Sequence, residues 1–147
     1  MNTVATTTIT PVTFDAVQVG DELPALQLPP VTRTTLALFA GASGDHNPIH
    51  IDTDFARQAG MPDVFAQGML GMAWLGRLLT QWAPQSQLRR FDVRFQGITH
   101  LGHAVRCSGR VLEKLEHNGE RCVRVEVLSA NQYGQARIAG EALVALR

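Results

Sequence analysis

Four stretches in the C-terminal part of the chain alternate apolar and polar side chains. A period of two residues is the pattern of strands that bury one face. The sequences HNG and YGQ, together with Gly102, supply turn-forming residues between the stretches. We therefore predict four antiparallel strands arranged as a meander, over residues 88–99, 103–116, 120–132 and 136–147.

A long apolar segment, residues 64–83, precedes these strands and carries a single charge, Arg77. A segment that is apolar nearly all round is typical of a helix enclosed by the rest of its domain. Its glycines, Gly68, Gly71 and Gly76, each cost about 1 kcal/mol in a helix interior. They indicate a close backbone approach or the start of the helix. One buried helix before an antiparallel sheet predicts an α+β fold in which the sheet wraps a long central helix.

Two shorter helices are predicted in the N-terminal half. Residues 32–43 combine a threonine N-cap with apolar positions at spacings of three and four, and Gly44 is a natural stop. Residues 53–60 predict a second helix with an Asp or Thr cap. Upstream, residues 14–23 predict a short strand and turn that lead into a proline-rich connector. The Thr-rich residues 1–13 predict a flexible segment, so the expected single domain is 14–147.

The composition narrows the range of partners. The chain has 147 residues, with 13 basic and 13 acidic side chains, so electrostatics favours neither nucleic acid nor an anionic membrane. The chain shows neither a signal peptide pattern nor a segment of roughly 18 apolar residues. We therefore expect a cytoplasmic protein that binds a small molecule or another protein chain. Cys107 and Cys122 lack metal-ligand spacing, so we expect two reduced thiols and no metal site.

The stretch ASGDHNPIH, residues 42–50, places polar and ionisable side chains between apolar segments. On a continuous helix Asp45 and His50 would point about 140° apart. Pro48 and Gly44 prevent a continuous helix, so the chain turns and can direct both side chains into one cleft. A carboxylate and an imidazole around one water molecule can act as a general acid/base pair, and the Asn47 amide can fix the loop or the water.

A second interpretation of this stretch is purely structural. In it Asp45 and Asn47 make Asx-type turn bonds, and His50 opens a strand as a packed residue. Composition and spacing leave both interpretations open.

Residues 39–56, FAGASGDHNPIHIDTDFA, closely resemble the signature of the MaoC-like, or (R)-specific enoyl-CoA hydratase, family, whose core is S-G-D-x-N-P-x-H. A second landmark of that family is a glycine at the start of the central helix, matched here by Gly68 within GML. The chain departs from the family where Gln67 replaces the usual histidine, and where Gly76 replaces a serine of some hydratases. The resemblance implies a hot-dog fold, in which an antiparallel sheet wraps the helix, and a homodimer.

The resemblance also implies an activity of fatty acid metabolism. Members interconvert trans-2-enoyl and (R)-3-hydroxyacyl thioesters of coenzyme A or acyl carrier protein, which is part of the substrate, so no separate cofactor is expected. By motif position Asp45 and His50 would be catalytic, and the Gly68 N–H would bind the thioester carbonyl. Asn47, Gln67 and Gly76 would be further substrate-binding positions. The alternatives are a hot-dog acyl-CoA thioesterase and one subunit of a heteromeric dehydratase.

Overall fold

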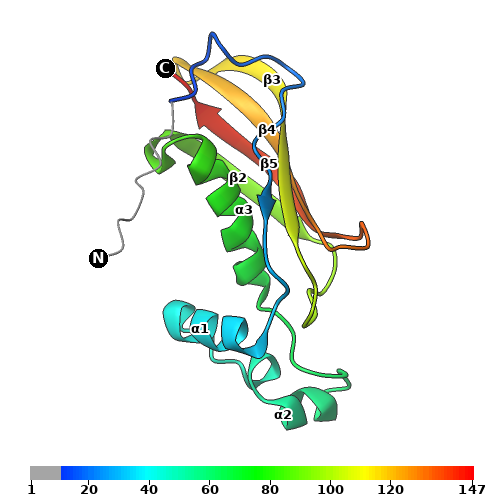
Figure 1. The fold of residues 1–147 in the computed structure, drawn as a ribbon. Helices are drawn as coiled ribbons and strands as arrows, with labels where there is room; N and C mark the ends of the chain where they lie inside the picture. Colours follow the sequence, from blue (N-terminus) through cyan, green and yellow to red (C-terminus); the bar gives the residue numbers. More distant parts are fainter. Residues whose placement is uncertain (1–10) are drawn as a thin grey trace, which may run out of the picture.

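A computed structural model describes residues 11–147 of the chain (Figure 1). Most of the predicted flexible segment 1–13 therefore lies outside the described residues. None of the helices within 11–147 is long and apolar enough to cross a membrane. The elements are β1 (Leu26–Gln27), α1 (Arg33–Ser43), the 3₁₀ helix η1 (Pro48–His50), α2 (Thr53–Gln58), α3 (Gly68–Trp82), the 3₁₀ helix η2 (Gln85–Gln87), β2 (Leu88–Phe95), β3 (Arg106–His117), β4 (Glu120–Ala130) and β5 (Ala136–Ala145).

The strands of residues 11–147 form one antiparallel sheet in the order β1-β3-β4-β5-β2. The predicted meander is confirmed for β3, β4 and β5, and a tight turn with left-handed residues at Asn118 and Gly119 joins the first two. It is wrong for β2, which pairs with β5 at the far edge instead of with β3. An alternating pattern shows that one face of a strand is buried, but it is the same wherever the strand lies in the sheet. The periodicity of β2 therefore did not identify β5 as its neighbour.

The predicted strand at residues 14–23 is also wrong. That segment turns twice and meets the sheet in one isolated bridge, between Glu22 and Arg110. Strand β1 lies further on, inside the stretch expected to be a connector. Three prolines, Pro24, Pro29 and Pro30, flank it and lack the N–H that a longer ladder needs, which limits β1 to an edge strand of two residues.

The sheet curls around α3, which packs on its concave face (Figure 1). Leu75, Leu78 and Leu79 of the helix share one almost fully buried cluster with inward-facing sheet residues such as Val125 and Ile138. The expected α+β hot-dog arrangement is therefore confirmed. We call the sheet together with α3 the body of the molecule. Within it, a Cβ on Gly140 of β5 would lie 2.0 Å from the Asp92 carbonyl oxygen of β2, so only glycine allows these two strands to approach so closely.

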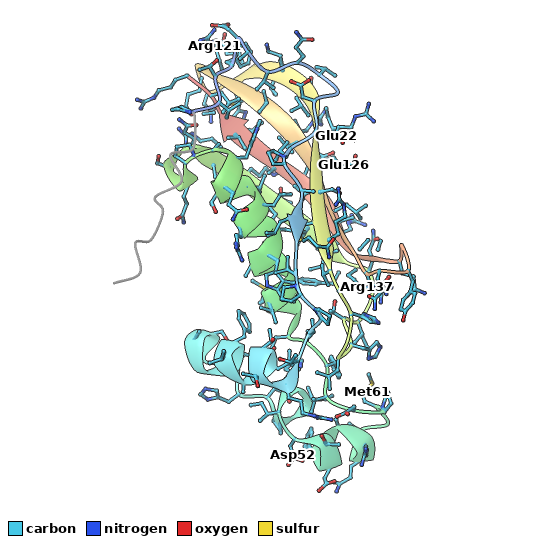
Figure 2. The ribbon with its side chains drawn as sticks, in the orientation of Figure 1. Glu22, Asp52, Met61, Arg121, Glu126 and Arg137 are labelled. Carbon is cyan, nitrogen blue, oxygen red and sulfur yellow. The ribbon has the colours of Figure 1, made fainter. Side chains whose placement is uncertain are left out.

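The helices α1, η1 and α2 form a separate layer beyond the N-terminal end of α3, which we call the helical lobe (residues 31–66; Figure 1). Both helix predictions are confirmed: Thr32 caps α1, Gly44 ends it with φ +76°, and Asp52 caps α2. In Figure 2 Asp52 and Met61 mark this lobe. A second apolar cluster joins the lobe to the start of α3: Val31, Leu36, Ala56, Val64, Ala66 and Leu70.

The two cysteines are free thiols buried in separate clusters. Burial raises the pKa of the Cys107 thiol to about 12, and burial also raises that of Cys122. Both therefore stay protonated at neutral pH and act as small apolar side chains, in agreement with the predicted reduced thiols.

Candidate active site

The turn after α1 is built by a chain of short polar bonds. Ser43 Oγ accepts from Asp45 N at 3.1 Å, Asp45 Oδ1 from Asn47 N at 3.3 Å, and Asn47 Oδ1 from Ile49 N at 3.1 Å. The Asx-type bonds of the structural interpretation are therefore present. They occupy one Asp45 oxygen and leave the other available. The Asn47 amide oxygen caps η1, which fixes the loop as the sequence indicated.

The structure brings Asp45 and His50 together. Asp45 Oδ2 lies 3.9 Å from His50 Nε2, which is too long for a direct hydrogen bond. A separation of 3.9 Å is short enough for the oxygen of one water molecule to hydrogen-bond to both atoms. The His50 side chain is 11% exposed and that of Asp45 is 42% exposed, so the imidazole is fixed while the carboxylate stays open to solvent. His50 ends η1 and does not open a strand.

The backbone carbonyl of Phe65 fixes the orientation of the imidazole. His50 Nδ1 lies 2.7 Å from Phe65 O, and the two rings meet edge to face. Because a carbonyl only accepts, Nδ1 must carry the hydrogen, and the lone pair of the neutral ring then lies on Nε2, which faces Asp45. Sequence reasoning missed Phe65, since a main-chain acceptor leaves no side-chain signature.

Gly68 is the first residue of α3, as the resemblance implied. Its N–H has no acceptor within residues 11–147, and it belongs to the positive end of the helix dipole. A Cβ at this position would lie 3.2 Å from the ring of Phe95, so the backbone sits close against that side chain. Gly68 therefore presents an accessible backbone donor beside an aromatic wall.

A hollow of about 310 Å³ opens beside this donor. Gly68, Phe95 and Thr99 belong to its lining, together with Phe65 and Gln67. Asp45 and His50 do not line this hollow. Phe65 connects the hollow to the Asp45–His50 pair, because Phe65 lines the hollow and its carbonyl bonds to His50. The two parts together offer a base, an acid and a donor for a developing oxyanion.

The remaining predicted positions lie around these groups. Gln67 is 1% exposed, and its Nε2 donates to Leu36 O at 3.1 Å. Gly76 lies two turns along α3, outside the lining of the hollow, with Phe91 at 3.6 Å from an added Cβ. Within residues 11–147, His, Cys, Asp and Glu side chains form no group that could hold a metal ion.

A larger hollow of about 740 Å³ lies on the outer face of the sheet, where Figure 2 labels Glu126. Its charged side chains pair with one another, as Arg124 does with Glu113 and Glu141. Such pairing is typical of a solvent-exposed surface, so we assign no catalytic or binding role to this hollow.

The chain shares its sequence pattern and fold with known proteins. The sequence profile of the MaoC like domain matches residues 8–132. The unliganded R-hydratase PhaJ1 from Pseudomonas aeruginosa is 28% identical with a TM-score of 0.79, over 92% of this chain and 86% of that one. A chain of the ChsH1-ChsH2 complex from Mycobacterium tuberculosis has the same fold, with 24% identity and a TM-score of 0.76, over 88% of this chain and 98% of that one.

The fatty acid synthase subunit beta of Saccharomyces cerevisiae is a relative with a much longer chain. It is 30% identical over 115 residues, which are 71% of this chain but only 6% of the yeast subunit. The likeness to that subunit is therefore confined to one small part of it. The profile match, by contrast, spans most of this chain, and the chain belongs to the MaoC-like hydratase/dehydratase family.

Proposed function

We propose that the protein is a hydratase/dehydratase that interconverts trans-2-enoyl and (R)-3-hydroxyacyl thioesters of coenzyme A or acyl carrier protein. One observation carries the proposal: His50 Nε2 and Asp45 Oδ2 face each other at 3.9 Å, while Phe65 holds the opposite nitrogen of the ring. Membership of the family supports the reaction class.

In the hydration direction, a water molecule hydrogen-bonded to both side chains loses a proton to the acid/base pair. Its oxygen forms a bond to the β-carbon, and the electrons of the C=C bond move toward the thioester carbonyl. The Gly68 N–H stabilises the resulting oxyanion, a role in which one fixed donor contributes about 3 to 4 kcal/mol. The pair then delivers a proton to the α-carbon, so one water molecule is added in all. Asn47 and Gly76 remain the other proposed substrate-binding positions, whereas the Gln67 side chain, also expected to bind substrate, is buried and turned toward Leu36, so it is given no substrate contact in this proposal.

The test is a series of enoyl thioesters of increasing chain length, beginning with crotonyl-CoA. Hydration removes the conjugated enoyl absorbance, and the chirality of the 3-hydroxyacyl product reports the face of addition. We expect (R) product from the parent chain and greatly reduced rates from D45N and H50Q. Absence of activity at every chain length, with D45N indistinguishable from the parent, would refute the proposal.

A thioesterase of the same fold is the main catalytic alternative. Thioesterases of this fold typically present an acidic residue on or near the central helix, and α3, GMLGMAWLGRLLTQW, contains no Asp or Glu. This observation favours the hydratase. Release of free thiol from a saturated acyl-CoA, without loss of enoyl absorbance from an unsaturated one, would favour the thioesterase.

Assembly with a second chain is part of the proposal. Strand β2 is an edge of the sheet, and Met69, Phe95 and Ile98 near its end are 40 to 55% exposed. An open edge beside apolar side chains needs a cover, and a second copy of this chain supplies one. The relative from the ChsH1-ChsH2 complex supports a heteromer as the alternative. Native mass spectrometry of the chain purified alone distinguishes the two, because a heteromeric subunit would not form an active homodimer.

A further inference from the structure

Gln67 combines an amide group with an almost fully buried position. It occupies the N-cap of α3, directly before Gly68, but makes no side-chain cap bond. Its side chain is instead turned toward α1, where its nitrogen meets the backbone of Leu36. Burial of an amide without partners is unfavourable, whereas an apolar side chain of the same length would bear no such cost. The position of this amide therefore calls for a specific partner.

The bond to Leu36 fixes which way the amide faces. Nε2 lies 3.1 Å from the Leu36 carbonyl oxygen, which only accepts, so the nitrogen must point to α1. The amide oxygen is then left buried, without a hydrogen-bond partner within residues 11–147. The amide thus retains its bond to α1 even though its second polar atom is unsatisfied.

Residues 65–68 gather the contacts that define the site. The Phe65 carbonyl holds His50, and Ala66 N donates to Thr99 O of the β2–β3 connection. The Gln67 side chain holds α1, and Gly68 presents the N–H donor of the oxyanion site. Leu36 lies near the start of α1, and the helix ends at Ser43 with Gly44 as its cap, so α1 leads directly to Asp45. One short segment therefore connects the acid, the base and the donor.

We propose that Gln67 is a positioning residue that locks α1, and with it the Asp45 turn, to the segment that carries Phe65 and Gly68. It acts through the Leu36 carbonyl, not through contact with the reacting atoms. This hydrogen bond is a direct polar link between the Gln67 side chain and α1. The apolar cluster around Leu36 forms the rest of the contact between α1 and the start of α3. The kinetic consequence rests on the proposed hydratase function, whereas the structural link does not.

Three variants and one control test the link. Q67M keeps the length of the side chain but has no donor, Q67N has an amide too short to reach Leu36, and Q67H places a ring N–H at a similar reach. L70M alters the same apolar cluster at nearly constant volume and serves as the matched control. We expect Q67M and Q67N to lower kcat by about 10- to 100-fold with KM changed less than about twofold, because small misplacements of reacting groups are costly. Q67H and L70M should stay within about threefold of the parent.

Hydrogen exchange provides a readout that does not need the reaction. Q67M and Q67N should speed the exchange of the α1 amides relative to the parent, while Q67H and L70M should not. Unchanged exchange and kcat in both Q67M and Q67N would overturn the proposal, and so would a rise in KM alone, which would mark a substrate contact. If the parent chain were inactive on every thioester, the proposed function would fail, and the exchange rates would still decide the role of Gln67.

Discussion

The body of the molecule and its helical lobe are held together by different forces. In the body, α3 and the concave face of the sheet bury a large cluster of aliphatic side chains, many of them completely. The lobe has a small apolar cluster, and polar bonds carry much of its structure. Among them, Arg33 of α1 bonds both Asp63 and Thr53 and so ties the starts of α1 and α2 to the chain that leads into α3.

Because of this difference, we expect stability and catalysis to depend on different regions of the molecule. Asp45 and His50 lie in the polar, partly exposed lobe, whereas Gly68 begins the helix on which the body is packed. The candidate site lies where the two regions meet, at residues 65–68. Conservative changes in the polar turn should therefore affect activity far more than stability, and changes in the tightly packed body should do the reverse.

The largest expected effect is that of Asp45→Asn on turnover. The variant keeps an Oδ1 acceptor for Asn47 N, so the turn can form, but it removes the carboxylate that faces His50. We expect kcat for an enoyl thioester to fall by about 10² to 10⁴-fold, the range for a lost acid or base. The melting temperature should match that of the parent. A large drop in melting temperature would mean that Asp45 is chiefly structural.

A proline at position 68 tests the other half of the site. Proline removes the N–H, yet it is favoured at the first position of a helix, and the preceding Gln67 already has φ −56° and ψ 135°, which a following proline requires. We expect G68P to lower kcat by about 10² to 10³-fold, as loss of one oxyanion donor does. G68A is the matched control, because its Cβ meets the same Phe95 ring at 3.2 Å but its N–H remains. Equal losses in both variants would show that bulk, not the donor, matters.

A methyl group at Gly140 should destabilise the body. The added Cβ would lie 2.0 Å from the Asp92 carbonyl oxygen and 2.7 Å from Val93 Cα, so the backbones of β2 and β5 must separate. Overpacking of this kind costs about 1 to 3 kcal/mol, which urea unfolding can measure. G76A is the comparison, since its Cβ meets Phe91 at an ordinary 3.6 Å and alanine favours a helix interior by up to about 1 kcal/mol. If G140A proved as stable as G76A, β2 would not pair with β5 as described.

The smallest expected effect concerns the exposed ion pair of the lobe. The Arg33 guanidinium beside Asp63 holds the pKa of that carboxyl well below its usual value of 3.8, with the Val64 N–H adding to the effect. A carboxyl with a lowered pKa contributes stability above its ordinary pKa and loses it as the pH falls toward the lowered value. D63N should therefore melt below the parent at neutral pH, and the difference should shrink as the pH falls below 3.8. A difference that is constant with pH would argue against this ion pair.

Much of the fold followed from local patterns. The alternating stretches became strands, the apolar segment became the central helix, and Thr32, Gly44 and Asp52 act at the helix ends as expected. These features depend on side-chain periodicity and backbone preferences within a few residues. The same local rules explain why Gly44 and Pro48 allow Asp45 and His50 to face each other.

Other features were decided by the tertiary structure alone. The pairing of β2 with β5, the Phe65 carbonyl behind His50 and the bond from Gln67 to Leu36 all join segments that are distant in the sequence. All three use main-chain acceptors, which every residue possesses and no residue type marks. The sequence by itself therefore determined most of the elements and the turn that carries Asp45 and His50. Tertiary packing decided which backbone groups orient these side chains, because that choice depends on distances that exist only in the folded chain.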